Sequence, residues 1–272
     1  GRYRRRMEQL KIRLWHLFVE SADGMLKACP VLVRGFDLRQ IFDVVRYEDG
    51  GYSREFSHQI RACLQSCVDM ERIERLAGHS RNKWERVEAI IILGYLDAPQ
   101  TVRILCANLK RKDEDEDVVY FSILALSHHK TPEVAGLLLK LIAEGIASGQ
   151  KIVSLLENFP PSIANSVSAE LKNADPSVRY WALKLLTRLK PVDLLFLVAA
   201  LTRDASADVR AAACECLGAL AQKEARGALC ERLQDEAWFV RMFAVRALGA
   251  IFGSEALESV ADLIHDASWP VK

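Results

Sequence analysis

Four copies of one short phrase decide the fold of this chain. They are NADPSVRYWALKLL (173–186), DASADVRAAACECLGAL (204–220), DEAWFVRMFAVRALGAI (235–251) and DASWPVK (266–272). In each copy a valine precedes a basic residue, and the pair recurs every 31 residues from Val178-Arg179 onward. A fixed period of this length is typical of helical repeats, in which each unit packs on its neighbours. The phrase therefore predicts a repeat array.

The same register extends back to about Asn82. A leucine near the end of each first helix recurs without insertion, at Leu93, Leu124, Leu155, Leu186, Leu217 and Leu248. One turn earlier most copies carry alanine, but Tyr120 and Lys151 do not, which marks 113–159 as divergent. Small residues follow the leucine column at Gly94, Ala125, Gly218 and Gly249. We expect these small residues to end helices before tight turns.

Each repeat also contains a second helical segment. The predicted second helices span 99–109, 132–142, 161–171, 192–201, 225–233 and 254–264, and three of them begin at a proline. The first helices are expected to start at Asn82, Asp113, Glu144, Asp175, Ser206, Ala237 and Ser268. Asn, Asp and Ser are favourable N-caps. With no strand pattern in the sequence, the prediction is an all-α fold, an α-solenoid of helix pairs.

The first 80 residues are less regular than the rest. Glu55 to Leu76 reads as one long helix or two, and Asp49-Gly50-Gly51 as a turn. We predict a helical capping region at 1–80 and a repeat array at 81–272 that breaks off within a repeat, so we expect the natural chain to continue past Lys272.

A cluster of arginines, Arg2, Arg4, Arg5 and Arg6, precedes a predicted amphipathic helix at about 7–20. The cluster is interpreted as a solvated helix start. Two alternatives are the cytosolic flank of a membrane anchor upstream of Gly1 and a contact with anionic lipid.

Composition favours a cytoplasmic location, with the cytosolic face of a membrane as the alternative. The chain has 37 basic and 36 acidic residues, so it lacks the basic excess of a dedicated nucleic-acid-binding protein. Its seven cysteines are interpreted as reduced core thiols. Cys63 and Cys67 have helical i, i+4 spacing, but no second pair completes a zinc site. No run of about twenty apolar residues occurs.

The pattern Asp-x-x-x-x-Val-Arg-x-x-Ala-x-x-x-Leu-Gly resembles the short HEAT-like repeat of the phycobilisome-lyase type. The match is close at 204–218 and 235–249, fair at 173–186 and weak at 113–159. Families with such repeats include bilin lyases, iron hydroxylases, DNA-alkylation glycosylases and scaffolds, so the resemblance implies a fold more than a function.

The resemblance also implies a ladder of ion pairs, in which each arginine pairs with the loop aspartate of its own or of a neighbouring repeat. Its members would be Arg179, Arg210 and Arg241 with the loop residues Asp204, Asp235 and Asp266. A carboxylate in an adjacent turn fits the planar fork of a guanidinium. The alternative is a line of arginines that awaits an acidic partner.

Catalytic and metal-binding motifs were sought and not found. Iron-dependent HEAT-type hydroxylases need recurrent His-Glu pairs, and none occurs in this sequence. His128-His129 is interpreted as a polar helix end. The acidic run at 112–117 lacks the glycine and distal glutamate of a calcium loop, so it is interpreted as a solvated loop before a helix. No catalytic, cofactor-binding or metal-binding residue is predicted, and no cofactor.

The leading functional hypothesis is a non-enzymatic adaptor that holds no cofactor and binds another protein along its second helices. Membrane attachment through a segment upstream of Gly1 is an added option. The predicted contact residues are exposed polar positions, namely Arg103, Asn108, Lys140, Asn165, Glu170, Arg203, Arg226 and Arg232. One alternative is a lyase-like subunit that holds a tetrapyrrole, with capture by a cysteine such as Cys106. A second alternative is a nucleic-acid-binding protein that uses tryptophans such as Trp181 and Trp238.

Overall fold

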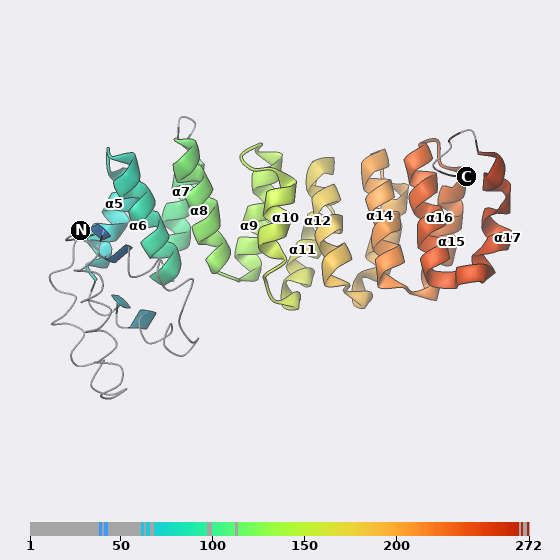
Figure 1. Ribbon diagram of the computed structural model, residues 1–272, viewed down its shortest axis with the longest axis horizontal. Helices are drawn as coiled ribbons and strands as arrows, with labels where there is room; N and C mark the ends of the chain where they lie inside the picture. Colours follow the sequence, from blue (N-terminus) through green and yellow to red (C-terminus); the bar gives the residue numbers. More distant parts are fainter. Residues whose placement is uncertain are drawn as a thin grey trace, which may run out of the picture. The chain divides into compact units, whose positions relative to one another are not determined.

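The computed structural model describes residues 38–39, 41–42, 61–62, 64–65, 68–96, 100–111, 114–266, 268 and 271. The chain divides into two compact units, residues 1–129 and 130–272, and each is considered by itself. Within the described residues every regular element is an α-helix or a 3-10 helix (Figure 1). The all-α repeat fold predicted from the 31-residue register is confirmed.

Unit 1 contains four described helices of at least nine residues: α5 (Met70–His79), α6 (Lys83–Leu96), α7 (Thr101–Leu109) and α8 (Glu116–His128). Asp69 caps α5 by accepting a hydrogen bond from the Arg72 N–H at 3.0 Å, so this helix starts at Met70. α6 packs on both α5 and α8. The apolar side chains of Ile90, Leu93 and Leu105 are fully buried in this unit.

Unit 2 alternates first and second helices, and from Pro176 onward the first helices are longer than the second helices. The first helices are α10 (Gly149–Leu156), α12 (Pro176–Leu189), α14 (Ala207–Leu220) and α16 (Trp238–Phe252). The second helices are α9 (Pro132–Ala143), α11 (Ala164–Glu170), α13 (Leu195–Ala200), α15 (Arg226–Glu231) and α17 (Leu257–Val260). α12, α14 and α16 stand side by side in Figure 1, and each packs on the next.

Most second helices are extended by 3-10 turns. These are η1 (Pro161–Ile163), η2 (Val192–Leu194), η3 (Leu201–Arg203), η4 (Lys223–Ala225), η5 (Arg232–Gln234), η6 (Gly253–Ala256) and η7 (Ala261–His265). Together with α7 and α9, these composite elements cover the six predicted second helices to within about two residues, which is the usual uncertainty of helix ends.

The core of unit 2 lies between successive first helices. Val178, Val209 and Val240 are fully buried, and so are the leucines about two turns later, Leu186, Leu217 and Leu248. Burying such a side chain contributes about 1.5–3 kcal/mol. The repeated valine and leucine therefore specify the same face of each first helix.

The divergent repeat departs from the predicted register. A first helix was expected from Glu144, but Glu144 ends α9 and α10 begins only at Gly149. Leu156 is fully buried, whereas Leu155, the expected core residue, is half-buried. A turn that contains Gly145, with a left-handed φ of 68°, separates α9 from α10. The Trp181 side chain occupies the space beside Gly149. A Cβ at Gly149 would lie 2.0 Å from Trp181 Nε1.

The glycine column has a different role from the one predicted. Gly94 and Gly218 lie inside α6 and α14, where a Cβ would approach the Ala125 Cβ to 2.6 Å and the Ala247 Cβ to 3.0 Å. These glycines therefore permit close approach of neighbouring first helices. The turns after α12 and α14 are made instead by Lys190 and Ala221, which adopt left-handed backbone with φ of 52° and 55°.

Several predictions fall outside the described residues. They concern the arginine cluster, the helix at 7–20, the turn at 49–51, the Cys63 and Cys67 pair, and Asp113 as a helix start. The domain boundary near residue 80 stays a prediction as well. Among the described residues, no helix combines the length and apolar character needed to cross a membrane.

Candidate functional site

Three arginines of unit 2 each join two successive repeats. Arg210 donates from Nε and Nη2 to the two carboxylate oxygens of Asp235, both at 2.8 Å. Its Nη1 donates to the main-chain oxygens of Asp204 and Ala205 at 3.1 and 3.2 Å. One guanidinium therefore holds the loop before its own helix and the loop before the next first helix.

The same arrangement is repeated on both sides of Arg210. Arg179 binds the Asp204 carboxylate at 2.8 and 2.7 Å, and Arg241 binds the Asp266 carboxylate at 2.6 and 2.8 Å. Each arginine also donates to two main-chain oxygens of the preceding loop. The structure thus pairs each of the three predicted arginines with the aspartate of the following repeat, 25 positions later in the sequence.

The aspartates of the ladder also shape the start of each first helix. One carboxylate oxygen of Asp204 accepts the Ser206 N–H at 2.9 Å, and Asp235 accepts the Ala237 N–H at 3.1 Å. These turns place the chain for α14 and α16. A single carboxylate therefore both orients a helix start and binds the arginine of the previous repeat.

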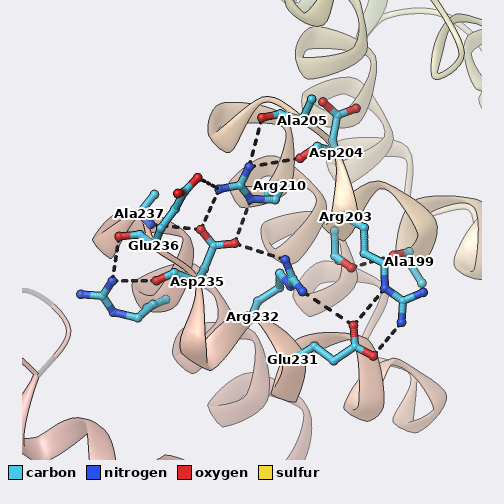
Figure 2. A network of polar contacts seen from close by, with 12 residues as sticks. Ala199, Arg203, Asp204, Ala205, Arg210, Glu231, Arg232, Asp235, Glu236 and Ala237 are labelled. Atoms are coloured by element: carbon cyan, nitrogen blue, oxygen red, sulfur yellow. Dashed lines mark hydrogen bonds and ion pairs between the residues drawn. The ribbon is translucent and has the colours of Figure 1, made fainter.

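Figure 2 shows how the ladder continues to the surface of the second helices. Asp235 also accepts a hydrogen bond from Arg232 at 3.3 Å, and Glu231 lies between Arg232 and Arg203. The side chains of Arg210 and Asp235 are only 8% and 2% exposed, whereas that of Arg203 is 68% exposed. The network therefore runs from a buried ion pair to a solvated one.

The pKa values of the ladder aspartates are lowered. Burial by itself would raise the pKa of Asp235, but the hydrogen bonds from Arg210 and the Ala237 N–H outweigh it and leave the pKa below its usual value. The pKa of Asp204 is lowered in the same way by Arg179 and the Ser206 N–H. Both groups are therefore held as carboxylates, which suits a structural ion pair rather than proton transfer.

Unit 1 contains a variant of the ladder that the sequence did not predict. Arg86 binds Glu114, with 2.7 Å between Nη1 and Oε1, and Arg111 lies 3.4 Å from the same carboxylate. The Glu114 side chain is 5% exposed. The acidic run is therefore not a fully solvated loop, although Asp115 caps α8 through the Asp117 N–H at 2.9 Å. The acidic partner of Arg86 is a glutamate that lies three residues beyond the position expected from the other pairs, so the 31-residue register did not predict this pair.

The prediction that Asn108 is an exposed contact residue is wrong. Asn108 is fully buried, donates to the Ala77 main-chain oxygen at 3.1 Å and accepts from Arg86 at 3.3 Å. Its amide satisfies backbone and guanidinium groups inside unit 1, which explains why a polar residue is buried here.

The other predicted contact residues divide into two groups. Glu170 and Arg232 are partly buried and make structural contacts, Glu170 with Asn173 at 2.9 Å and Arg232 with Asp235. The exposed group comprises Arg103, Lys140, Asn165, Arg203 and Arg226. Within it, Arg203 binds Glu231 at 2.6 Å, and the Arg226 guanidinium lies 5.0 Å from the centre of the Phe252 ring.

Apolar side chains on the second helices of unit 2 were missed by the sequence analysis. Phe196 on α13 is 77% exposed, and Val192 and Leu257 are also largely exposed. Phe196 occupies the repeat position held by Asn165 in the preceding unit and Gly227 in the following one. An aromatic residue at a repeat position that is otherwise polar or small could have indicated this exposed apolar side chain from the sequence.

The buried thiols fit the core interpretation. Burial raises the pKa of Cys214 to about 12 and that of Cys216 to about 11. Both cysteines lie on α14 and are fully buried. A thiol in such surroundings is a poor nucleophile and a poor metal ligand. Among the described residues, no three His, Cys, Asp or Glu side chains are grouped so that they could hold a metal ion.

Comparison with known proteins supports the fold of the C-terminal part. A sequence-family model described as HEAT repeats matches residues 194–272. A search of curated proteins gave no match.

Several solved structures of helical-repeat proteins are similar at low sequence identity. Human deoxyhypusine hydroxylase is 18% identical, with 92% of this chain and 91% of that chain covered and a TM-score of 0.37. A designed armadillo repeat protein in complex with the peptide (KR)4 is 16% identical, with 87% and 95% covered and a TM-score of 0.36. The CpcE and CpcF complex of phycocyanin lyase from Nostoc sp. PCC7120 is 17% identical, with 72% and 81% covered and a TM-score of 0.33. Scores in this range carry no inference about function.

Proposed function

We propose that this chain is a non-enzymatic protein-binding scaffold that recognises its partner through the second helices of unit 2. The observation that carries the proposal is Phe196, a large aromatic side chain that is 77% exposed on α13. Burying such a side chain contributes about 1.5–3 kcal/mol to an association. Aromatic anchors are also enriched among the residues that dominate protein interfaces.

The surroundings of Phe196 support the same proposal. Val192, one turn earlier, is also exposed, and Arg203 with its partner Glu231 lies beyond the end of α13. An apolar centre with a charged rim is the usual composition of a protein interface. The buried arginines and aspartates of the ladder bind each other, so we assign partner binding to the exposed surface around Phe196.

We also propose that residues 173–249 are short HEAT-like repeats of the phycobilisome-lyase type. This proposal rests on the Asp, Val-Arg, Ala and Leu-Gly positions of the sequence. Scaffolding and lyase activity share this fold, and the buried, high-pKa thiols of Cys214 and Cys216 favour scaffolding for this part of the chain.

The test is affinity capture with the purified full chain as bait and an extract of the source cells. Three baits are compared by quantitative mass spectrometry: the wild type, Phe196→Asp and Lys151→Asp. Lys151 is exposed on α10, a first helix, and serves as the matched control. We expect Phe196→Asp to lose its specific partner by about tenfold or more, since 1.4 kcal/mol corresponds to a factor of ten.

Far-UV circular dichroism and urea unfolding establish that both variants are folded. Equal retention of the same proteins by all three baits would contradict the role of the second-helix surface. Retention of no protein above the resin background would contradict the scaffold itself.

A further inference from the structure

A row of carboxylates lies at one end of the second helices of unit 2. Asp193, Glu224 and Glu255 occupy the same repeat position, 31 residues apart, in η2, η4 and η6, and all three residues are exposed. Within the described residues none of them forms an ion pair, whereas Glu231, at the other end of α15, binds Arg203 at 2.6 Å. We call these three carboxylates the acidic row, and their charges are available to a cation of a partner.

The basic residues close to the acidic row do not recur with the repeat. Lys190 and Lys223 are exposed, while Arg226 donates to the Ser259 hydroxyl at 3.3 Å and lies over the Phe252 ring. None of the three basic residues has a basic counterpart 31 residues away in either direction. Negative charge is therefore the property that successive repeats share along this edge.

Exposed apolar side chains lie beside the acidic row on the same face. Phe196 follows Asp193 by three residues, a spacing that places both side chains on one side of a helix. Phe196 and Val192 are both largely exposed. In the next repeat Gly227 takes the place of Phe196, and a Cβ there would meet nothing within 4 Å. The face thus offers an aromatic anchor next to an open position, with carboxylates along one edge.

The spacing of the acidic row matches the rise of an α-helix. Neighbouring packed helices lie about 8–10 Å apart, so successive carboxylates of the row recur at about that interval. Seven residues of an α-helix, or about two turns, advance it by about 10.5 Å and return to the same side. A helix that lies across the second helices therefore places every seventh residue opposite one carboxylate.

We propose that the partner presents an amphipathic α-helix with lysine or arginine at every seventh residue, whose cations meet the acidic row while its apolar side covers Phe196. The proposal rests on the scaffold function proposed above and adds the class of partner. Carboxylates near a helix start also interact favourably with the helix dipole. That role predicts no preference for a basic partner, so binding is the property to measure.

The test uses two fluorescent synthetic peptides, both alanine-based helices with the same stripe of leucines. One has lysine at every seventh position, and the other has glutamate at those positions. Their affinities for the purified full chain are measured by fluorescence anisotropy. We expect the wild type to bind the lysine peptide about tenfold or more tightly than the glutamate peptide. Added salt should weaken this binding, because exposed charges are screened.

Two triple variants with an equal loss of charge make the test specific. The first neutralises the acidic row by Asp193→Asn, Glu224→Gln and Glu255→Gln. The second neutralises three exposed carboxylates outside the row by Glu71→Gln, Glu144→Gln and Asp208→Asn. The first variant should bind the lysine peptide about tenfold or more weakly than the wild type, and the second should bind it equally well. Circular dichroism and urea unfolding check that both are folded.

Equal affinity of the wild type for the two peptides would overturn the proposal, as would equal affinity of the wild type and the acidic-row variant for the lysine peptide. Absence of binding to the wild type at about 1 mM peptide would do the same. So would self-association in sedimentation velocity that the acidic-row variant abolishes, since a second copy of this chain would then occupy the row. These results would leave the scaffold function standing, because its own test is the loss of a captured protein by Phe196→Asp.

Discussion

Arg210 binds groups from two loops at once, and its loss should affect more than one repeat. Arg210→Ala leaves the buried Asp235 carboxylate with Arg232 as its remaining side-chain partner and removes the donor to two main-chain oxygens. Removing one member of a buried ion pair costs about 3–5 kcal/mol. We expect a decrease of that order in the free energy of unfolding, measured by urea denaturation.

Arg203→Ala is the matched control for this variant. Arg203 also forms a two-pronged pair with a carboxylate, that of Glu231, but both side chains are exposed. Exposed pairs contribute about 0.2–1 kcal/mol. Equal losses of stability for the two variants would contradict the structural role assigned to the ladder.

The ladder aspartates also predict how stability depends on pH. Because the pKa values of Asp204 and Asp235 are lowered in the folded state, their contribution is complete above the unfolded-state pKa of about 3.9 and is lost as pH falls through the folded-state value. The urea midpoint should therefore be nearly constant from about pH 6 to 5 and fall below about pH 4.

Asp235→Asn isolates one contribution to this pH dependence. The variant should be less stable than the wild type at neutral pH, and its urea midpoint should fall less steeply below about pH 4, since one titrating group is removed. An identical slope for the variant and the wild type, measured over the same range, would show that Asp235 is not the group involved.

At the residue level, the sequence could predict the features that recur at the same position of each repeat, but not those specific to one repeat. The resemblance to short HEAT-like repeats implied the ladder, and the 31-residue register located its three arginines and three aspartates. The burial of Asn108 and the exposure of Phe196 depend on neighbours in other helices, which periodicity does not specify. The Arg86–Glu114 pair was missed because its acidic partner is displaced by three residues from the ladder spacing.

The helix ends give a prediction at the scale of single elements. Ala221 ends α14 with a left-handed φ of 55°, a conformation that costs a residue with a Cβ about 1–2 kcal/mol. Ala221→Gly should therefore raise the free energy of unfolding by about 1 kcal/mol. Ala107→Gly, at an exposed position inside α7, should lower it by about 0.5–1 kcal/mol. Two changes of the same sign in urea unfolding would contradict the assigned backbone conformation.

The contact between α6 and α8 gives a second prediction for elements. A Cβ at Gly94 would lie 2.8 Å from the Ala125 Cα, which is main chain and cannot rotate away. Gly94→Ala should therefore destabilise the chain by about 1–3 kcal/mol through overpacking. Gly227→Ala has open space around it on α15 and should be neutral or slightly stabilising. Comparable losses for both variants in urea unfolding would argue against close packing at Gly94.

For the elements, the sequence predicted the regular repeats well and the divergent one poorly. Each predicted second helix is present, because proline and apolar spacing mark it. α10 begins only at Gly149, after a turn at Gly145 with φ of 68°, and the 31-residue register does not mark that turn. The glycine column was assigned to turns because a glycine near a helix end is a common stop signal, whereas here it serves packing between helices.

At the scale of the whole chain, the division into two units gives a further prediction. Residues 130–272 form a compact unit of first and second helices with its own core. Expressed alone, this segment should retain its helix content in circular dichroism and unfold cooperatively in urea, because repeats are stabilised mainly by their nearest neighbours. A segment without helical signal would contradict the independence of this unit.

The central claim is that residues 31 apart on successive first helices of unit 2 lie side by side at a constant spacing. Lys184, Glu215 and Arg246 occupy one such position on α12, α14 and α16. Spin labels on a non-natural amino acid at these positions allow pairwise distances to be measured by pulsed electron paramagnetic resonance without use of native thiols. With neighbouring helix axes about 8–10 Å apart, the 184–246 distance should be close to twice the 184–215 and 215–246 distances, which should equal each other. Unequal steps, or a 184–246 distance no longer than a single step, would contradict the repeat stacking.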